Sequence, residues 1–214
     1  MAVQEGNTQS MMSAYNALNG VPSTANGWLL NTVLRDEWGF EGYVVSDCGA
    51  PTYIQKSHKY VNTKEEAAKV ALEGGLDLEC GDDIYAEHLL KAYENGLVSQ
   101  ESIDMAVKRV LTARFKLGIF DKVDGNPYSK ISPDVIGSKK HQELALETSR
   151  QSMVLLKNQN DILPLNVKDI KKIAVVGFNA NQVVFGDYSG LPVIKPISPL
   201  EGIGNKVGDK AEVT

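Results

Sequence analysis

The sequence predicts an α/β fold with parallel strands, and two features of its pattern support this. Within residues 1–121, a short apolar run, a polar loop and a helix-like run follow one another three times. This alternation is typical of βα units, whose strands lie parallel in one sheet. A further apolar strand pattern, KKIAVVGFNAN, comes after a segment rich in Gly, Pro, Ser and Asp at residues 122–137. We therefore expect two α/β parts, at residues 1–121 and 138–214, joined by a linker.

The first part contains three short apolar runs that predict strands, at residues 8–14, 43–46 and 76–78. An Asn-Gly turn at Asn19 and Gly20 follows the first strand, and a helix is expected after it at residues 28–38. A long loop and a helix at residues 64–73 follow the second strand. The third strand leads into a helix that Asp82 or Asp83 can cap and Gly96 can end.

A fourth helix has clear start and stop signals. Ser99 is its expected N-cap and Gly118 its expected end, with one apolar face made by Ile103, Val107, Val110 and Leu111. In the linker, Pro127 and Pro133 both block regular helix. A helix at residues 139–156 and the strand in KKIAVVGFNAN then begin a second α/β layer, which we expect to be only started within this chain.

Composition narrows the classes of ligand. The 214 residues carry a net charge of −5 with 27 acidic side chains, so a nucleic-acid partner is not expected and a neutral ligand is favoured. No apolar run approaches the length that crosses a bilayer, so no membrane partner is expected. No signal peptide is visible after Met1, which leaves the compartment open.

Metal and nucleotide sites are not supported either. Two cysteines, with no HExxH motif or close His pair among His58, His88 and His141, do not make a four-ligand zinc site. Gly202 and Gly204 begin a dinucleotide-like pattern, but Val207 stands where a third glycine would be needed.

Polar side chains follow all three predicted strands of the first part. Tyr15 follows the first strand, Asp47 the second and Glu79 the third. Functional groups of parallel α/β proteins lie at the carboxyl ends of the strands, so these three side chains are candidates for one site. The alternatives are that Asp47 only caps a turn with Gly49 and that Tyr15 is a core aromatic with a satisfied hydroxyl.

Several long motifs identify the family that the chain resembles. MMSAYNALNGVP, WLLNTVLRDEWGFEGYVVSDCGA, ALEGGLDLECG and VKRVLTARFKLGIFD are similar to glycoside hydrolase family 3, the exo-acting β-glucosidases and β-xylosidases. RQSMVLLKNQNDILPL and KKIAVVGFNAN resemble the entry into that family's second, α/β sandwich domain. The resemblance implies the last three βα units of a (β/α)₈ TIM-type barrel, a linker, and the start of the sandwich domain.

The resemblance also implies a mechanism and site residues. Asp47, which closes the VVSD strand, would be the catalytic nucleophile, and Met12 and Tyr15 would line the adjoining sugar subsite. A retaining glycosidase needs such an ionised carboxylate on one face of the sugar and a protonated acid on the other. A tyrosine hydroxyl can orient the nucleophile and stabilise developing charge. The substrate would be an oligosaccharide or aryl glycoside, and no cofactor is expected.

The two cysteines bear on the choice of sugar. The Ser-Asp-Cys pattern at Cys48 and the Leu-x-Cys-Gly pattern at Cys80 resemble the β-xylosidase-like branch, since β-glucosidase-like members usually have Trp after the nucleophile. Both cysteines end neighbouring strands, so their side chains could meet at the pocket rim. A disulfide there would place Cys48 in the substrate-binding wall and favour a pentose. The alternative is two buried free thiols.

The resemblance places other parts of the site elsewhere. Glu79 is a carboxylate on the adjacent strand, but the family takes its acid/base from the second domain, beyond Thr214, and a Lys-His pair from before Met1. We therefore expect an interior segment that needs the remaining barrel and sandwich domains, in a periplasmic or secreted enzyme. A β-glucosidase is the alternative within the same chemistry. A non-catalytic carbohydrate-binding module is the alternative from another class.

Overall fold

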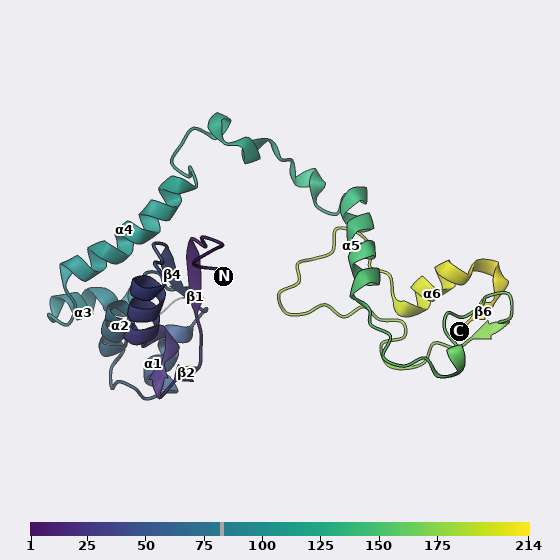
Figure 1. Ribbon diagram of the computed structural model, residues 1–214, viewed down its shortest axis with the longest axis horizontal. Helices are drawn as coiled ribbons and strands as arrows, with labels where there is room; N and C mark the ends of the chain where they lie inside the picture. The colour runs from purple at the N-terminus through teal and green to yellow at the C-terminus, as the bar shows by residue number, and fades with distance from the viewer. Residues whose placement is uncertain (82–83) are drawn as a thin grey trace. The chain divides into compact units, whose positions relative to one another are not determined.

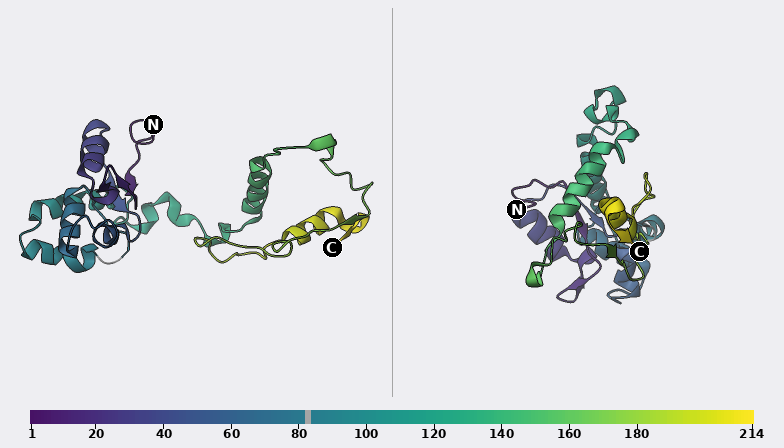
Figure 2. Two further views of the ribbon diagram at one scale, coloured as in Figure 1. Left: turned by 90° about the horizontal axis from the view of Figure 1, so that it is seen from below. Right: turned by 90° about the vertical axis from the view of Figure 1, so that its right-hand side faces the viewer.

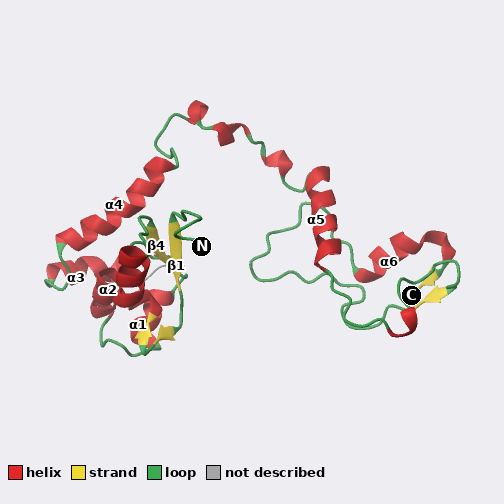
Figure 3. Cartoon of the chain, viewed as in Figure 1, coloured by secondary structure: helices red, strands yellow, loops and turns green. Residues whose placement is uncertain are grey.

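The computed structural model describes residues 1–81 and 84–214. The chain divides into two compact units, Met1–Pro127 and Tyr128–Thr214. In Figure 1 the first unit runs from purple to teal and the second from green to yellow. Both units contain helices and short strands (Figure 3).

The main sheet of the first unit is a parallel pair, β1 (Ser10–Ser13) and β4 (Tyr43–Ser46). The register places Ser10 opposite Tyr43 and Ser13 opposite Ser46, so both strands end at the same edge (Figure 1). β4 coincides with its predicted span, and β1 is shorter than residues 8–14. The alternating burial along β4, with Val44 fully buried, anchors the strand in the core.

The prediction of a third regular strand, at residues 76–78, is wrong. Residues 76–78 form only a single parallel bridge, between Val45 and Leu78. Leu78 still lies beside β4, because its carbonyl oxygen accepts a hydrogen bond from Ser46 N at 2.9 Å. The pairing between β4 and this segment stays short. Val44 N donates at 2.8 Å to the buried Asp77 carboxylate, where a longer strand would offer a backbone carbonyl as the acceptor.

A hairpin follows β1. β2 (Ala17–Leu18) pairs antiparallel with β3 (Val21–Pro22). Between them Asn19 has φ +51° and Gly20 φ +83°, and two left-handed residues in a row are what a type I′ turn requires. The predicted Asn-Gly turn is confirmed.

Seven helical segments complete the described first unit up to Lys116, and Figure 2 shows this part of the chain, purple to teal, from two further sides. They are η1 (Ser23–Ala25), η2 (Trp28–Glu37), α1 (Ala50–Lys56), α2 (Lys64–Glu73), η3 (Tyr85–Leu89), α3 (Leu90–Glu94) and α4 (Gln100–Lys116). The helices predicted at residues 28–38 and 64–73 are confirmed. The segment predicted as one long loop contains α1, which begins after left-handed Gly49 and carries a proline in its first turn, where a missing N–H costs nothing.

Helix ends in this unit follow local signals. Thr63 and Glu66 form a capping box at the start of α2. The Ser99 side chain accepts a hydrogen bond from Ser102 N, and Gly118, with φ +69°, follows the end of α4. Gly96, with φ +68°, follows the end of α3. The predicted caps Asp82 and Asp83 lie outside the described residues.

The predicted apolar face of α4 is only partly buried. Ile103 packs against the core, but Val107 is 48% exposed and Leu111 37% exposed. The buried position is Ala106, whose small side chain allows close approach. Most of the core comes from β4, from the inner faces of other helices and from residues beside these elements: Leu30, Leu34, Val44, Ile54, Ala67, Ala71, Leu76 and Ile84.

A buried ion cluster joins η2, α4 and β4 to the segment at residues 76–78. Asp77, whose side chain is 1% exposed, pairs with Arg35 of η2 at 2.5 Å and with Arg109 of α4 at 2.9 Å. Burial lowers the pKa of the Arg35 guanidinium, and the neighbouring Asp77 carboxylate acts in the opposite direction. With Val44 of β4 also bonded to Asp77, one carboxylate ties two helices to the sheet.

The segment between the two predicted parts contains three short turns of 3₁₀ helix, η4 (Val123–Gly125), η5 (Pro127–Lys130) and η6 (Pro133–Val135). The second unit then has α5 (Lys139–Ser152), η7 (Gln159–Asp161), β5 (Lys172–Ile173), α6 (Pro199–Val207), η8 (Gly208–Lys210) and β6 (Glu212–Val213). β5 and β6 pair in parallel. The domain boundaries at residues 121 and 137 stay a prediction.

Two elements of the second unit are shorter than predicted. α5 ends at Ser152 rather than at residue 156, since Met153 is extended. Met153 is 71% exposed and Leu156 92%, so no buried apolar face supports another helical turn. β5 has two residues, although Val175 N continues the pairing by donating to Thr214 O at 2.7 Å.

The described chain is thus a mixture of helices and small sheets, with parallel pairing in both units. Among the helices of residues 1–81 and 84–214, none combines the length and apolar character needed to cross a membrane.

Candidate active site

Asp47 lies directly after β4, at the edge of the sheet where both parallel strands end. Its N–H donates to Ser13 O at 3.0 Å, and its Oδ1 accepts a hydrogen bond from Cys48 N at 2.7 Å. Its carbonyl accepts from Ala50 N, which forms the turn into α1. The side chain is half-buried. Asp47 therefore does two things: its backbone forms the turn into α1, and its carboxylate lies at the edge where the strands end.

The loop after Asp47 packs closely against the loop after residue 78. Gly49 N donates to Cys80 O at 2.9 Å, and Cys80 N donates to Ser46 Oγ at 2.9 Å. A Cβ at Gly81 would lie 3.0 Å from Gly49 N, and its φ of +88° also requires glycine. Cys48 and Cys80 form a disulfide here, with Cα atoms 4.4 Å apart. The covalent bond therefore lies at the same edge as Asp47.

Tyr15 reaches this loop from the first strand. Its hydroxyl donates a hydrogen bond to Cys48 O. Its ring centre lies 5.4 Å from that of Tyr53 on α1, with the planes tilted by 55°. The phenol is 43% exposed, so it is not a core aromatic. Met12, three residues earlier on β1, is 63% exposed.

Glu79 has a different role from its two predicted neighbours. Its Oε1 accepts a hydrogen bond from Ile84 N at 3.0 Å and its Oε2 one from Tyr85 N at 2.5 Å. Both oxygens therefore serve the start of η3, where backbone N–H groups lack partners within the helix. The structure brings Tyr15, Asp47, Cys48 and Cys80 together and uses Glu79 as a helix cap.

Two further side chains at this edge were not found from the sequence. His58 Nε2 lies 2.8 Å from Tyr15 O, and Tyr53 packs on the Tyr15 ring. Both belong to α1 or the turn after it, in the segment predicted as a long loop. No local pattern marks them, because their partner lies about 40 residues away in the sequence.

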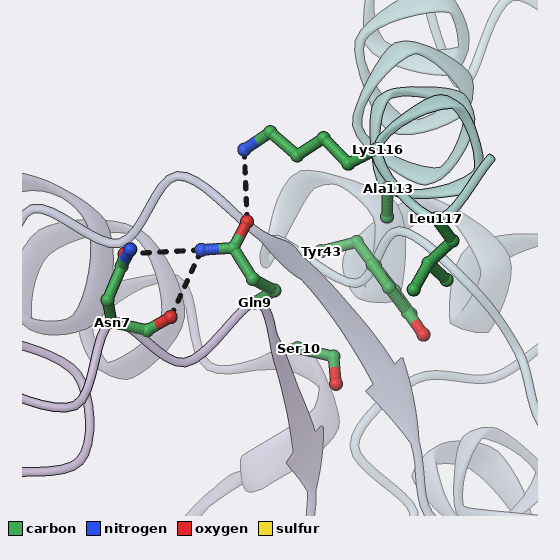
Figure 4. A pocket seen from close by; sticks show the side chains of 7 residues that line it. All are labelled: Asn7, Gln9, Ser10, Tyr43, Ala113, Lys116 and Leu117. Carbon is green, nitrogen blue, oxygen red and sulfur yellow. Dashed lines mark hydrogen bonds between the residues drawn. The ribbon is translucent and has the colours of Figure 1, made fainter. Parts of the chain in front are cut away.

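A cavity of about 540 Å³ lies at the opposite ends of the same two strands. Figure 4 shows its lining: Asn7, Gln9, Ser10, Tyr43, Ala113, Lys116 and Leu117. Lys116 Nζ donates to Gln9 Oε1 at 3.0 Å, across the cavity mouth. None of these seven described residues is a carboxylate, so the lining does not supply the carboxylate pair that glycoside hydrolysis uses. Within the described part of the chain, no group of three or more His, Cys, Asp or Glu side chains could hold a metal ion.

Comparison with known proteins assigns the family. Residues 1–113 match the glycosyl hydrolase family 3 N-terminal domain, and residues 153–214 match the family's C-terminal domain. The β-xylosidase/α-L-arabinofuranosidase 1 of Medicago sativa subsp. varia is 41% identical over 94% of this chain and 26% of its own length. The periplasmic β-glucosidase of Salmonella typhimurium is 38% identical over 95% of this chain and 27% of its own.

Solved structures agree with this. A GH3 exo-β-xylosidase in complex with a xylobiose aziridine activity-based probe has a TM-score of 0.83 at 34% identity, over 98% of this chain and 27% of that one. A β-glucosidase from Erythrobacter marinus has a TM-score of 0.82 at 33% identity, over 100% of this chain and 28% of that one. The chain thus spans about a quarter of the length of these relatives. On the match of both domains, the chain belongs to glycosyl hydrolase family 3.

Proposed function

We propose that the protein carrying this chain is a retaining exo-β-glycosidase that removes terminal β-linked sugars, with Asp47 as the nucleophile. The observation that carries the proposal is the half-buried Asp47 carboxylate at the common edge of β1 and β4. Its Oδ1 accepts a hydrogen bond from Cys48 N, and the Asp47 backbone is fixed because its N–H donates to Ser13 O. A covalent glycosyl-enzyme requires a nucleophile of fixed position that the sugar can still reach. The glycosidase names of the relatives support the same reaction class.

The adjoining sugar subsite is proposed to be lined by Tyr15, Met12 and Cys48. Tyr15 and Met12 both expose side chains at or just after β1, and Cys48 follows the nucleophile directly. The Tyr15 hydroxyl lies against the carbonyl of Cys48, one residue from Asp47. From there it can act on charge that develops near the nucleophile as the glycosidic bond breaks.

We propose β-xylosides as the preferred substrates. The disulfide between Cys48 and Cys80 lies at the strand edge beside Asp47. We propose that it narrows the space for the hydroxymethyl arm of a hexose. A β-xylosidase from Formosa agariphila, 36% identical over 99% of this chain, supports the same choice. A β-glucosidase is the second candidate, favoured by the similarity to the Salmonella and Erythrobacter enzymes.

The acid/base of this reaction is proposed to come from outside this chain. Both oxygens of Glu79 bind backbone N–H groups of η3, which leaves this carboxyl in a structural role. We further propose that β1, β4 and the segment at residues 76–78 belong to the last βα units of a (β/α)₈ barrel. Their parallel pairing in chain order, with helices between them, supports this arrangement.

Trapping the covalent intermediate tests the proposal. The protein, extended in both directions to the length of its relatives, is incubated with a 2-fluoro-β-xyloside or a 2-fluoro-β-glucoside bearing an activated leaving group. Peptide mass spectrometry should find the sugar on Asp47, with faster labelling by the xyloside. The Asp47→Asn variant should stay unlabelled, and Glu79→Gln should be labelled at the normal site. A label on another carboxylate, or binding of sugar without any label or turnover, would contradict the proposed nucleophile.

A further inference from the structure

We propose that His58 is a positioning residue for Tyr15 and, through Tyr15, for the sugar subsite beside Asp47. The inference rests on the proposed function, which it extends by one residue. His58 Nε2 lies 2.8 Å from the carbonyl oxygen of Tyr15, a contact between residues 43 positions apart in the chain. It joins the turn after α1 to the segment just beyond β1.

The direction of this hydrogen bond is set by its acceptor. A carbonyl oxygen only accepts, so Nε2 must carry the proton, either in the neutral Nε2–H tautomer or in the imidazolium. The neutral tautomer protonated on Nδ1 instead would lose the contact. A side-chain amide of similar reach can donate in the same way, and a phenyl ring cannot.

Tyr15 is held at three points by the chain that runs from Asp47 to His58. Its hydroxyl donates to Cys48 O, its ring packs on Tyr53, and its carbonyl accepts from His58. The first two contacts act on the side chain, and only the third of these fixes the backbone from which the phenol projects. Loss of the His58 contact therefore lets the phenol shift relative to Asp47, and misplacement by about 1 Å is enough to slow a glycosidase.

The backbone of His58 is anchored independently of its imidazole. His58 N donates to Tyr53 O at 2.8 Å, and Ser57 N donates to the same oxygen at 3.1 Å, which closes the end of α1. Substitution of the His58 side chain therefore leaves the end of the helix in place. Gln55, on the same helix, offers a matched control: it is also half-buried and also donates to a backbone carbonyl, that of Asn62, at 3.4 Å.

The test measures kcat/KM for an aryl β-xyloside in the extended protein, normalised to active sites titrated with the fluoro-sugar. His58→Ala and His58→Phe should each lower kcat/KM about tenfold, the effect of losing one well-placed hydrogen bond. His58→Gln should restore most of the activity, and Gln55→Ala should leave it unchanged. In the Tyr15→Ala background, His58→Ala should cause less than about a twofold further loss, because its effect acts through Tyr15.

Equal losses from His58→Ala in the two backgrounds would overturn the positioning role, as would a His58→Gln variant no better than His58→Phe. A purely structural role would lower the number of titrated sites without changing the normalised rate, and this too would overturn it. If Asp47 is labelled and the His58→Ala variant keeps a normal kcat/KM, the role of His58 is rejected while the proposed function stands. Absence of label on Asp47 in the unsubstituted protein would reject the proposed function, and the role of His58 with it.

Discussion

The hydroxyl of Tyr15 donates a hydrogen bond to the carbonyl oxygen of Cys48, and each of these residues lies two positions beyond the end of its strand. The Cys48 side chain is in turn bonded to Cys80, beyond the bridge at Leu78. Three strand-end segments are thus linked in series around Asp47. The links are of three kinds: a hydrogen bond, a disulfide and backbone pairing.

The first prediction concerns Asp47 as the nucleophile. In the extended protein, Asp47→Ala should abolish turnover of aryl β-glycosides, because no other group can form the covalent intermediate. Added azide should partly restore activity by replacing the carboxylate. The release of the aryl group is followed by absorbance, with Asp36→Ala as a control on an exposed helix position. Near-full activity of the Asp47→Ala variant would contradict the assignment of Asp47 as the nucleophile.

The disulfide gives a second prediction. The unreduced native chain should react with no thiol reagent, because its two cysteines are joined. Reduction, or the double substitution of Cys48 and Cys80 by Ser, should lower the free energy of unfolding by about 3–4 kcal/mol, as expected for a closed loop of this size. Urea denaturation with and without reductant measures the difference. Two readily alkylated thiols in the unreduced chain would contradict the bond.

The buried ion cluster gives a third prediction. Asp77→Ala leaves Arg35 and Arg109 without their shared carboxylate, so the free energy of unfolding should fall by about 3–5 kcal/mol. Asp104→Ala removes an exposed carboxylate from α4 and should change it by less than about 0.5 kcal/mol. Guanidinium denaturation compares the two variants. Equal stability of the two would mean that the cluster contributes nothing to folding.

The capping box of α2 predicts a pH dependence. Hydrogen bonds from Asn62 N and Thr63 N hold the pKa of the Glu66 carboxyl below its ordinary value. A depressed pKa in the folded state means that the stabilisation is present above the unfolded pKa of about 4.3 and is lost as pH falls through the folded value. We therefore compare the free energy of unfolding between about pH 5 and about pH 3, a range that brackets the unfolded pKa. Over this range it should fall less steeply in Glu66→Gln than in the unsubstituted chain.

Glu41→Gln is the control for this measurement, since Glu41 is an exposed carboxylate in the loop before β4. It should keep the acid sensitivity of the unsubstituted chain. A Glu66→Gln variant with the same pH slope as Glu41→Gln would show that the capping box does not govern acid stability.

The last prediction is that the 214-residue chain alone hydrolyses no xylo-oligosaccharide at a detectable rate. With the acid/base proposed to lie outside this chain, Asp47 would face a leaving group that is not protonated, which typically costs about 10²–10⁴-fold. At most a trace of activity is expected on dinitrophenyl β-xyloside, whose leaving group needs acid least. A side-by-side assay with the extended protein tests this. Comparable kcat/KM on an unactivated disaccharide would place the acid inside this chain, with Glu79 the first residue to substitute.

Local signals in the sequence were enough to predict several elements and the family. The strand at residues 43–46, the Asn19–Gly20 turn, the helix at residues 64–73 and the start of α4 at Ser99 all depend on neighbouring residues only. Apolar periodicity, left-handed turn residues and caps act over a few positions, so they can be read without a structure. The long motifs, among them the one around Asp47, likewise identified the family because the residues of each are contiguous.

Tertiary structure alone decided what the polar groups at the strand ends do. Glu79 looks equivalent to Asp47 in the sequence, yet its two carboxylate oxygens accept hydrogen bonds from Ile84 N and Tyr85 N at the start of η3. Residues 76–78 form a bridge rather than a strand because the Asp77 side chain enters the ladder. The His58–Tyr15 contact joins residues 43 positions apart. The Asp77 and His58 contacts depend on how distant segments pack, and packing is a property of the folded chain that no local pattern encodes.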